Sequence, residues 1–457
     1  MVVPEDPVVV AGTQCALRLL TESVPIASVS ARGECIEEGA RFFVDALAAA
    51  GLRPQLWSSA GAPVVFGEWP APPGRPTILF YGHYDVQPAE PLEDWDSPPF
   101  EPSIRDGALY GRGAGDNKGQ LLAHLAAVTE LLARDDLGVG VKFLIEGEEE
   151  IGSPHLADVV RAHRDDLAAD LALTADAPVH DDGRPVVIFG VRGLLYLEVS
   201  LDGAPRDLHS GNRGGIAPTP AWTLVHALAA LRAPDGRITV PGFYEAVRQP
   251  DEAEQAMIEA LPVDAERMEA DLGASGAARW QHAAPWQTSP WEALGFQPNC
   301  NIAGLTAGYQ GQGTKTVIPS RASAKVDFRL VADQDPETVF AAVKCQLEHS
   351  APGIRVRRTA SVPPSATSPS TPLAAPVIEA VRSATGVDPL LRPRLGGTTP
   401  DFVFTRILGM PSILVPYGPP DMNHHAPNEK MTLAALQRGV ACSLEICRRL
   451  AQEDPGS

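Results

Sequence analysis

Apolar residues in the first 190 or so residues follow two alternating patterns. One pattern places apolar residues at helical spacing, as in ECIEEGARFFVDALAAAG (residues 34–51), where the last glycine could end a helix. The other is a short apolar run, as in PTILF (residues 76–80), which is typical of a strand buried on both faces. Because the two patterns alternate, they predict an α/β fold with a mostly parallel sheet covered by helices.

The pattern changes in the middle of the chain, from about residue 193 to residue 372. In ASAKVDFRLV (residues 322–331) apolar and charged residues alternate, which predicts a strand with one apolar face. The predicted elements around it follow the order β-α-β-β-α-β, a small ferredoxin-like sheet with two helices. A polar segment at about residues 233–298 interrupts this order after the first helix.

The last 80 or so residues return to the first pattern, with an apolar run in PSILVPY (residues 411–417) and a final helix from Thr432. We therefore predict one discontinuous α/β domain made of residues 1–192 and 373–457. A smaller domain, residues 193–372, is inserted into it and carries its own insertion at about 233–298.

Composition and charge limit the location and the partners. Apolar runs reach only 4 to 8 residues, far short of the ~20 that a membrane span needs, and the N-terminus predicts no secretion signal. The balance of 37 basic and 57 acidic residues gives a net charge of −20 without a basic cluster, which argues against nucleic acid or membrane as a partner. Six scattered cysteines without a CxxC pair predict free thiols in the cytoplasm.

Residues that can bind a metal ion follow the predicted strands. Ligands of open α/β sheets bind outside the carboxyl ends of the strands, so these residues could meet at one edge. Each of them alone would be weak evidence, but together they form the mixed nitrogen and oxygen ligand set that suits Zn²⁺ or Mn²⁺. The candidates are His83 and Asp85 in YGHYDVQP, Asp116 in GRGAGDNKG, Glu149 and Glu150 in EGEEEIGS, Asp176, and His424 and His425 in GPPDMNHHAPNEK.

Six motifs occur in a fixed order along the chain: HYDVQP, GRGAGDNKG, EGEEEIGS, DLHSG, TVIPSRASAKVDFRL and HHAPNEK. This set resembles the dinuclear zinc metallopeptidases that include cytosolic nonspecific dipeptidase (carnosinase), acetylornithine deacetylase, succinyl-diaminopimelate desuccinylase and glutamate carboxypeptidase. The carnosinase branch resembles the chain most, over nearly its whole length. The resemblance implies that the outer segments form the catalytic domain and that residues 193–372 form a lid and dimerisation domain.

The resemblance also implies two divalent metal ions, with zinc expected and manganese or cobalt as alternatives. Asp116 would bridge both ions, and its peptide bond to Asn117 would be cis. Asp85 would orient the imidazole of the first histidine ligand. The implied ligands are His83, Asp116 and Asp176 for the first ion, and Asp116, Glu150 and His425 for the second.

The triple glutamate leaves the register of the catalytic base open. Alignment on Glu146, Gly147, Gly152 and Ser153 makes Glu148 the variable position, so that Glu149 is the expected general base and Glu150 the ligand. In the implied mechanism two cations lower the pKa of a water, and Glu149 takes its proton and returns it to the leaving amine. His424 is interpreted as structural.

Residues of the inserted domain would complete the site. His209 in DLHSG would stabilise the oxyanion across the interface of a homodimer, and the alternative is a histidine that caps a turn. Arg329 would bind the terminal carboxylate of the substrate, and the alternative is a surface salt bridge. Thr316, Gly397 and Thr398 match positions that contact the peptide, where the family more often has serine in place of Thr398.

The resulting hypothesis is an enzyme that hydrolyses the amide bond of dipeptides or short peptides. A deacylase that acts on an N-acyl or N-carbamoyl amino acid is the alternative, because it would share the metals, the base and the carboxylate site. A two-metal phosphoesterase would need basic residues around its phosphates, which the acidic composition disfavours. A binding or scaffold protein would have no evident use for a base beside a metal ligand.

Overall fold

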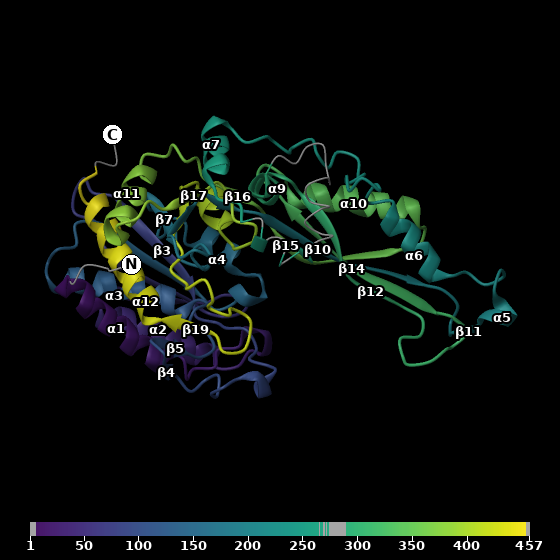
Figure 1. Cartoon of the computed structure of the whole chain (residues 1–457), viewed down its shortest axis with the longest axis horizontal. Helices are drawn as coiled ribbons and strands as arrows, with labels where there is room; N and C mark the ends of the chain where they lie inside the picture. The colour runs from purple at the N-terminus through teal and green to yellow at the C-terminus, as the bar shows by residue number, and fades with distance from the viewer. Residues whose placement is uncertain (1–5, 265, 268–269, 271, 274–288, 454–457) are drawn as a thin grey trace. The chain divides into compact units, whose positions relative to one another are not determined.

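The computed structural model describes residues 6–264, 266–267, 270, 272–273 and 289–453. These residues form two compact units. The first contains the chain up to residue 190, residues 366–393 and the chain from residue 400, whereas the second contains residues 191–365 and 394–399. Figure 1 shows the elements of both units.

The first unit is built on a mixed sheet of eight strands. The pairs β6–β3, β3–β7, β7–β18 and β8–β17 are parallel, and the other three are antiparallel, so the predicted mostly parallel sheet is confirmed. In spatial order the strands are β1 (Arg53–Trp57), β2 (Val64–Trp69), β6 (Gly140–Glu146), β3 (Thr77–His83), β7 (Leu171–Thr174), β18 (Ser412–Leu414), β8 (Val186–Ile188) and β17 (Leu390–Arg392).

Helices cover both faces of this sheet. Successive side chains of a strand point to opposite faces, so apolar neighbours in one strand pack into two separate layers. On β3, Leu79 and Tyr81 belong to a core with α4 (Leu156–Ala162) and the π-helix Val403–Leu408. Phe80 points to the other face and contacts His124 of α3 (Lys118–Ala133). On that side α3 packs with α1 (Pro7–Ser23) and α12 (Leu433–Leu450), and α12 also packs with α11 (Ala374–Thr385).

His124 is a buried titratable group within this helical layer. Its Nδ1 lies 2.9 Å from Ser443 Oγ of α12, and burial lowers its pKa to about 3. The unfolded chain binds a proton at this residue below about pH 6.5, whereas the folded chain resists it. The free energy of unfolding therefore decreases as the pH falls from about 6.5 towards 3, because only the unfolded chain gains the proton.

We expect the free energy of unfolding to fall by about 2 kcal/mol through His124 alone when the pH is lowered from about 7 to about 5. Urea denaturation of the wild type and of His124→Gln at both pH values measures this contribution, because glutamine does not titrate there. The variant should lose less stability on acidification, while exposed His349→Gln should behave as the wild type. An equal loss in His124→Gln and in the wild type would contradict the assignment.

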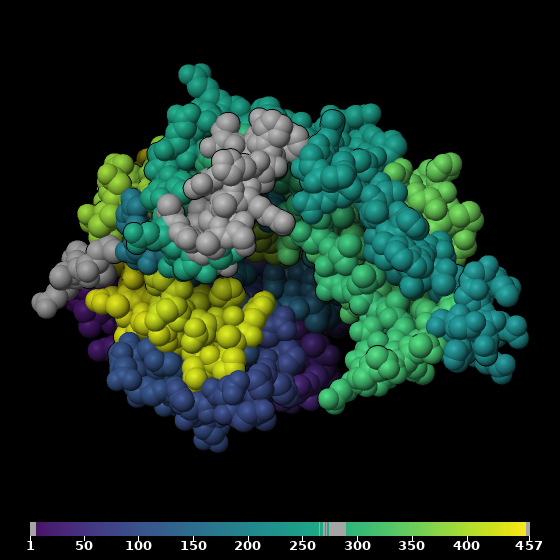
Figure 2. Space-filling model, turned by 45° about the vertical axis from the view of Figure 1, so that its right-hand side comes forward, coloured from purple at the N-terminus to yellow at the C-terminus, as the bar shows by residue number. Residues whose placement is uncertain are grey.

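A small three-stranded sheet joins two distant segments of the first unit. It contains β4 (Ser103–Arg105), β5 (Ala108–Tyr110) and β19 (Lys430–Thr432), and β19 pairs with β5. In Figure 2 the C-terminal segment, in yellow, lies against the blue segment that contains β4 and β5. This pairing brings the chain just before residue 430 to the loop that follows β5.

The second unit contains the predicted order β-α-β-β-α-β, which is confirmed. Its antiparallel sheet has the strand order β12-β14-β10-β15, which is the ferredoxin-like order. The elements in chain order are β10 (Gly193–Asp202), α6 (Pro220–Ala229), β12 (Asn299–Ala307), β14 (Arg321–Leu330), α10 (Pro336–Ser350) and β15 (Arg355–Val362).

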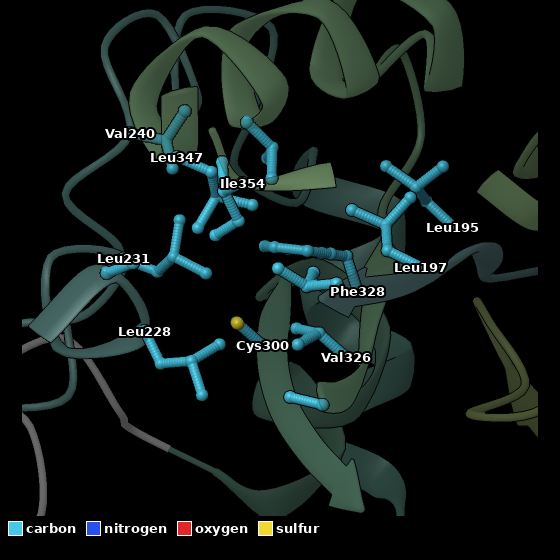
Figure 3. Packing of buried hydrophobic residues seen from close by; sticks show 14 of the residues in the cluster. Leu195, Leu197, Leu228, Leu231, Val240, Cys300, Val326, Phe328, Leu347 and Ile354 are labelled. Carbon is cyan, nitrogen blue, oxygen red and sulfur yellow. The ribbon is translucent and has the colours of Figure 1, made fainter. Parts of the chain in front are cut away.

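One face of this sheet packs against both helices. Figure 3 shows Leu197 of β10, Phe328 of β14, Leu228 of α6 and Leu347 of α10 among the buried side chains of this core. Along β14 buried residues alternate with more exposed ones, as the apolar and charged pattern of residues 322–331 predicts.

The predicted insertion at about 233–298 lies partly outside the described residues. Its described part includes α7 (Glu252–Ala260) and α9 (Pro290–Phe296). The helix α7 begins with a capping box, in which the Asp251 side chain and Glu254 each accept a hydrogen bond from the backbone of the other. Among the described helices none has both the length and the apolar character to cross a bilayer.

Candidate metal centre

Three neighbouring parallel strands deliver the predicted ligands to one edge of the sheet. His83 is the last residue of β3, Glu149 and Glu150 follow three and four residues after the end of β6, and Asp176 follows two residues after the end of β7. Because β6, β3 and β7 are adjacent and parallel, their carboxyl ends lie side by side.

The glycine-rich loop before α3 places Asp116 at the same edge. Gly113 has a φ of 87°, and a Cβ on it would come within 2.7 Å of the Val86 side chain, so this turn requires glycine. The peptide bond between Asp116 and Asn117 is cis, as the resemblance implies. The Asn117 amide donates to the carbonyl of Ala175, 2.5 Å away, which ties the loop to the exit of β7.

The carboxylate of Asp116 lies between two histidines. Its Oδ1 is 3.3 Å from Nε2 of His83, and its Oδ2 is 3.0 Å from Nε2 of His425. Nε2 of His83 is also 3.6 Å from Oδ2 of Asp176, and Nε2 of His425 is 3.1 Å from Oε2 of Glu150. Each oxygen of Asp116 therefore faces a different histidine, which is the arrangement that a carboxylate bridging two cations would need.

Glu149 belongs to the same cluster. Ligand atoms of His83, Glu149 and Asp176 all lie within 4.8 Å of one another, and the same holds for His83, Asp116 and Glu150. Geometry therefore brings Glu149 as close to the first group as a ligand, and its assignment as a base depends on the motif register.

The electrostatics of the cluster fit cations. Burial raises the pKa of Glu149 well above its ordinary value, and the charges of Asp176, Glu150 and Asp116 raise it further, although His83 opposes this. Hydrogen bonds to Asp116 and Glu150 raise the pKa of His425 to about 10. Carboxylates this close repel one another when ionised, and cations among them would relieve that repulsion.

The orientation of His83 supports the same conclusion. Its Nδ1 lies 3.1 Å from the backbone oxygen of Asp85 and 3.4 Å from Oδ1 of that residue, which places the proton on Nδ1. Its buried Nε2 has no hydrogen-bond partner among the described residues and faces the oxygens of Asp116 and Asp176, where its lone pair would bind a metal ion. The carboxylate of Asp85 accepts from the backbone N–H groups of Glu149 (3.2 Å) and Glu150 (3.1 Å), so it positions both the imidazole and the glutamate loop.

The loop that carries His425 has an unusual backbone. Asn423, His425 and Asn428 all have positive φ values of 54° to 59°, a region that residues with a side chain rarely adopt. The side-chain oxygen of Asn428 accepts from the backbone N–H of Asp96 (2.9 Å), which helps to hold this conformation. His424 is exposed, and its ring contacts that of His425 at 5.5 Å between centroids.

Sequence reasoning missed a buried ion pair that holds the bridging loop. Oε1 of Glu429 accepts from the backbone N–H groups of Gly115 (2.9 Å) and Asp116 (3.0 Å), while Oε2 accepts from Arg112 (2.7 Å). Both charged side chains are buried. Arg112 and Glu429 lie within the motifs GRGAGDNKG and HHAPNEK, so the signal was present, but the pairing between them is not visible in the sequence.

Gln87 was missed as well. It lies in HYDVQP and donates to Oε2 of Glu150 at 2.9 Å. This contact orients the Glu150 carboxylate, which also faces His425.

His209 and Thr316 lie together in the second unit. The strand β11 (Leu208–His209) pairs with β13 (Val317–Ile318), and Nε2 of His209 lies 3.5 Å from Oγ1 of Thr316. Nδ1 of His209 accepts from the backbone N–H of Gly211 at 3.0 Å, so the turn-capping role exists. This bond also places the proton of a neutral imidazole on Nε2, where it can be donated.

The remaining predicted residues form another group in the second unit. Arg329 donates to Oγ1 of Thr398 at 2.8 Å, and its Nε lies 3.9 Å from Asp327. The carbonyl of Gly397 accepts from the backbone N–H of Arg192 at 3.1 Å. The arginine and the LGGTTP loop therefore meet, as expected for a shared carboxylate site.

Comparison with known proteins identifies similar sequences and structures. Beta-Ala-His dipeptidase of Rattus norvegicus is 32% identical over 381 residues, which cover 81% of this chain and 76% of the relative. The Cys-Gly metallodipeptidase dug1 of Schizosaccharomyces pombe is 28% identical over 416 residues, or 86% of this chain and 84% of the relative.

The metallo-carboxypeptidase Sso-CP2 from Sulfolobus solfataricus is 34% identical, with a TM-score of 0.88 over 96% of this chain and 99% of its own. Human carnosine dipeptidase 1 is 29% identical, with a TM-score of 0.77 over 97% and 98% of the two chains.

The sequence pattern of peptidase family M20/M25/M40 matches residues 79–449, which include every predicted metal ligand and the inserted domain. The match spans far more than half of the chain, and the relatives agree with it. This chain belongs to peptidase family M20/M25/M40.

Proposed function

We propose that this chain hydrolyses the amide bond of dipeptides or short peptides, with a water activated by two divalent ions and by Glu149. Metal-dependent dipeptide hydrolysis is the activity that the family and the dipeptidase relatives support. The observation that carries the two-ion proposal is the Asp116 carboxylate, which faces a different histidine with each oxygen.

Each ligand group would hold one ion. His83, Asp116 and Asp176 would bind the first, whereas Asp116, Glu150 and His425 would bind the second. Zinc is the proposed metal, with manganese or cobalt as alternatives, because imidazole nitrogens and carboxylate oxygens suit these ions. When bound, the two cations would acidify a water and polarise the substrate carbonyl.

The residues of the chain would move the proton. Glu149 would take the proton from the water and then give it to the leaving amine. Asp85 accepts a hydrogen bond from the backbone N–H of Glu149 and so holds this residue in position for proton transfer. His209, with its proton on Nε2, would stabilise the oxyanion.

The second unit would bind the substrate. Arg329 and Thr398 share a hydrogen bond, and together with Gly397 they would bind the terminal carboxylate of the peptide. Thr316, beside His209, would contact the peptide near the reacting bond.

We further propose that the chain forms a homodimer through the second unit, which would act as a lid and dimerisation domain inserted into the catalytic domain. The strand β12 lies at the edge of its sheet, with Ile302 and Leu305 exposed. Trp222 of α6 is 64% exposed, and Val225 is exposed beside it. An unpaired strand edge and large exposed apolar residues favour association with a partner.

A cytoplasmic location completes the proposal. All six cysteines are free, and free thiols persist in a reducing compartment.

The proposed function is tested by metal analysis and a substrate panel. The purified protein should contain about two divalent ions per chain, lose activity with a chelator and recover it when zinc, manganese or cobalt is added back. It should hydrolyse dipeptides faster than N-acyl or N-carbamoyl amino acids. Faster hydrolysis of the acylated or carbamoylated compounds would replace the proposal with the deacylase alternative, and full activity in chelator would remove both.

The shared site gives a further prediction. The variant His209→Ala should lose about 10²–10³ in kcat, because one oxyanion donor is removed. Mixing it with Glu149→Gln should restore activity, because one site of a mixed dimer combines the intact base of one chain with the intact histidine of the other. Random exchange makes about half of the dimers mixed, each with one working site, so about a quarter of wild-type activity should return.

Differential tags on the two variants would confirm that mixed dimers form, and unmixed variants give the background. Background activity in confirmed mixed dimers would show that His209 acts within its own chain or not at all. The two-ion hydrolase would survive that result, but the shared site would not.

A further inference from the structure

The insertion contains a buried carboxylate that the mechanism does not use. Glu254 of α7 is 1% exposed, and both of its oxygens accept hydrogen bonds. Arg248 donates to both oxygens at 2.6 and 2.7 Å, and Arg394 donates to Oε1 at 2.7 Å. The backbone N–H of Asp251 also donates to Oε2 at 3.0 Å.

An aromatic ring and close packing fix the two arginines. Phe296 of α9, which is buried, lies 5.7 Å from the guanidinium carbon of Arg248 and 5.5 Å from that of Arg394. A Cβ on neighbouring Gly295 would come within 3.3 Å of Cβ of Arg394. Helices α7 and α9 of the insertion therefore both hold Arg394.

Arg394 begins the segment 394–399, which contains two residues of the proposed carboxylate site. Arg192 holds the middle of this segment: its backbone N–H donates to the carbonyls of Leu395 (3.3 Å) and Gly397 (3.1 Å). Its Nε donates to the carbonyl of Gly396 at 2.8 Å. The segment then ends beside Arg329, which donates to Thr398.

The charges around this segment suit an anion. Burial and the nearby positive charge of Arg329 together lower the pKa of Arg192 to about 10, although Asp327 opposes this. The guanidinium groups of Arg192 and Arg329 repel each other, and a bound carboxylate would relieve that repulsion.

A buried ion pair often adds no stability over a well-packed apolar pair, so stability alone is a weak explanation for Glu254 and Arg394. What the pair supplies is geometry, because hydrogen bonds to a planar guanidinium fix both its position and its orientation. The residues that depend on that geometry are two to four positions further along the chain, at Gly396, Gly397 and Thr398.

We propose that Glu254 and Arg394 are positioning residues that hold segment 394–399, so that Thr398 and Arg329 can bind the terminal carboxylate of the substrate. The insertion thereby sets the affinity for substrates with a free carboxyl terminus. This inference rests on the proposed function of Arg329.

The test compares a dipeptide with the same dipeptide carrying a C-terminal amide. In Glu254→Gln the KM for the dipeptide should rise about tenfold, because a charged hydrogen-bond acceptor of Arg394 is lost, while kcat changes little. The inhibition constant of the amide should stay at its wild-type value, since the amide presents no carboxylate. The control Glu259→Gln, on the exposed side of the same helix, should change neither constant.

Metal content and thermal melting show whether each variant is folded. The double variant with Glu254→Leu and Arg394→Met removes the buried Glu254–Arg394 pair together and leaves Arg248 beside Asp333, 3.6 Å away. It therefore provides the test if Glu254→Gln does not fold. It should keep its metal and still show the raised KM for the dipeptide. A folded double variant with the wild-type KM, or an equal loss for dipeptide and amide, would overturn the positioning role.

The variant Arg329→Gln distinguishes a failure of the proposed carboxylate site from a failure of the positioning role. If this variant binds the dipeptide and the amide as the wild type does, the proposed carboxylate site itself fails. If it loses the preference for the free carboxylate while the Glu254 variants keep it, the carboxylate site stands and only the positioning role falls.

Discussion

Replacing Glu149 with glutamine is expected to lower kcat by about 10²–10⁴ while both metal ions remain bound. Glutamine has nearly the same size and keeps the backbone N–H that donates to Asp85, so the loop should not move. It cannot take a proton from water, however, and the reaction would lose its base. The measurement is kcat of the purified variant together with its metal content per chain.

The matched control is the same substitution one residue further along. The Oε2 atom of Glu150 faces His425 and accepts from Gln87, so Glu150→Gln should mainly weaken the second ion. Its activity should recover with added metal, whereas that of Glu149→Gln should not. Swapped results would show that the register through the triple glutamate is wrong. Glu149 lies close enough to His83 and Asp176 to be a ligand itself, so the experiment distinguishes the two assignments.

Much of the fold was predictable because its signals are local. The apolar run of residues 76–80 indicated a strand buried on both faces, and in β3 Leu79 and Phe80 do face separate layers. The alternation in residues 322–331 likewise predicted which face of β14 is buried. Strand order is different, because it depends on contacts between distant segments: no local pattern revealed that β2 pairs antiparallel with β6.

The same distinction applies to the site. Metal ligands have a local signal, because an imidazole or a carboxylate directly after an apolar strand is conspicuous. The groups that hold those ligands have none, since Arg112 and Glu429 are ordinary charged residues until the fold brings them together across 317 positions. Glu254 and Arg394, 140 positions apart, are a second case.

Asp116→Ala should cause the largest loss of metal among single substitutions at the centre. Its two oxygens face His83 and His425 separately, so removing this one side chain would take a ligand from both proposed ions. The loop itself should persist, because Glu429 binds the backbone N–H of Asp116, which alanine retains. We therefore expect more than one ion per chain to be lost, and activity to fall to background even with added zinc.

Asp176→Ala is the control that gives this result its meaning. Asp176 lies near His83, with Nε2 of that histidine 3.6 Å from its Oδ2, and is assigned to the first ion alone. This variant should lose about one ion per chain and retain the other, which mass spectrometry of the metal can count after gel filtration. Circular dichroism would show that both variants remain folded. If Asp116→Ala kept both ions, or lost no more than Asp176→Ala, the carboxylate would not bridge, and the two ligand groups would have to be assigned anew.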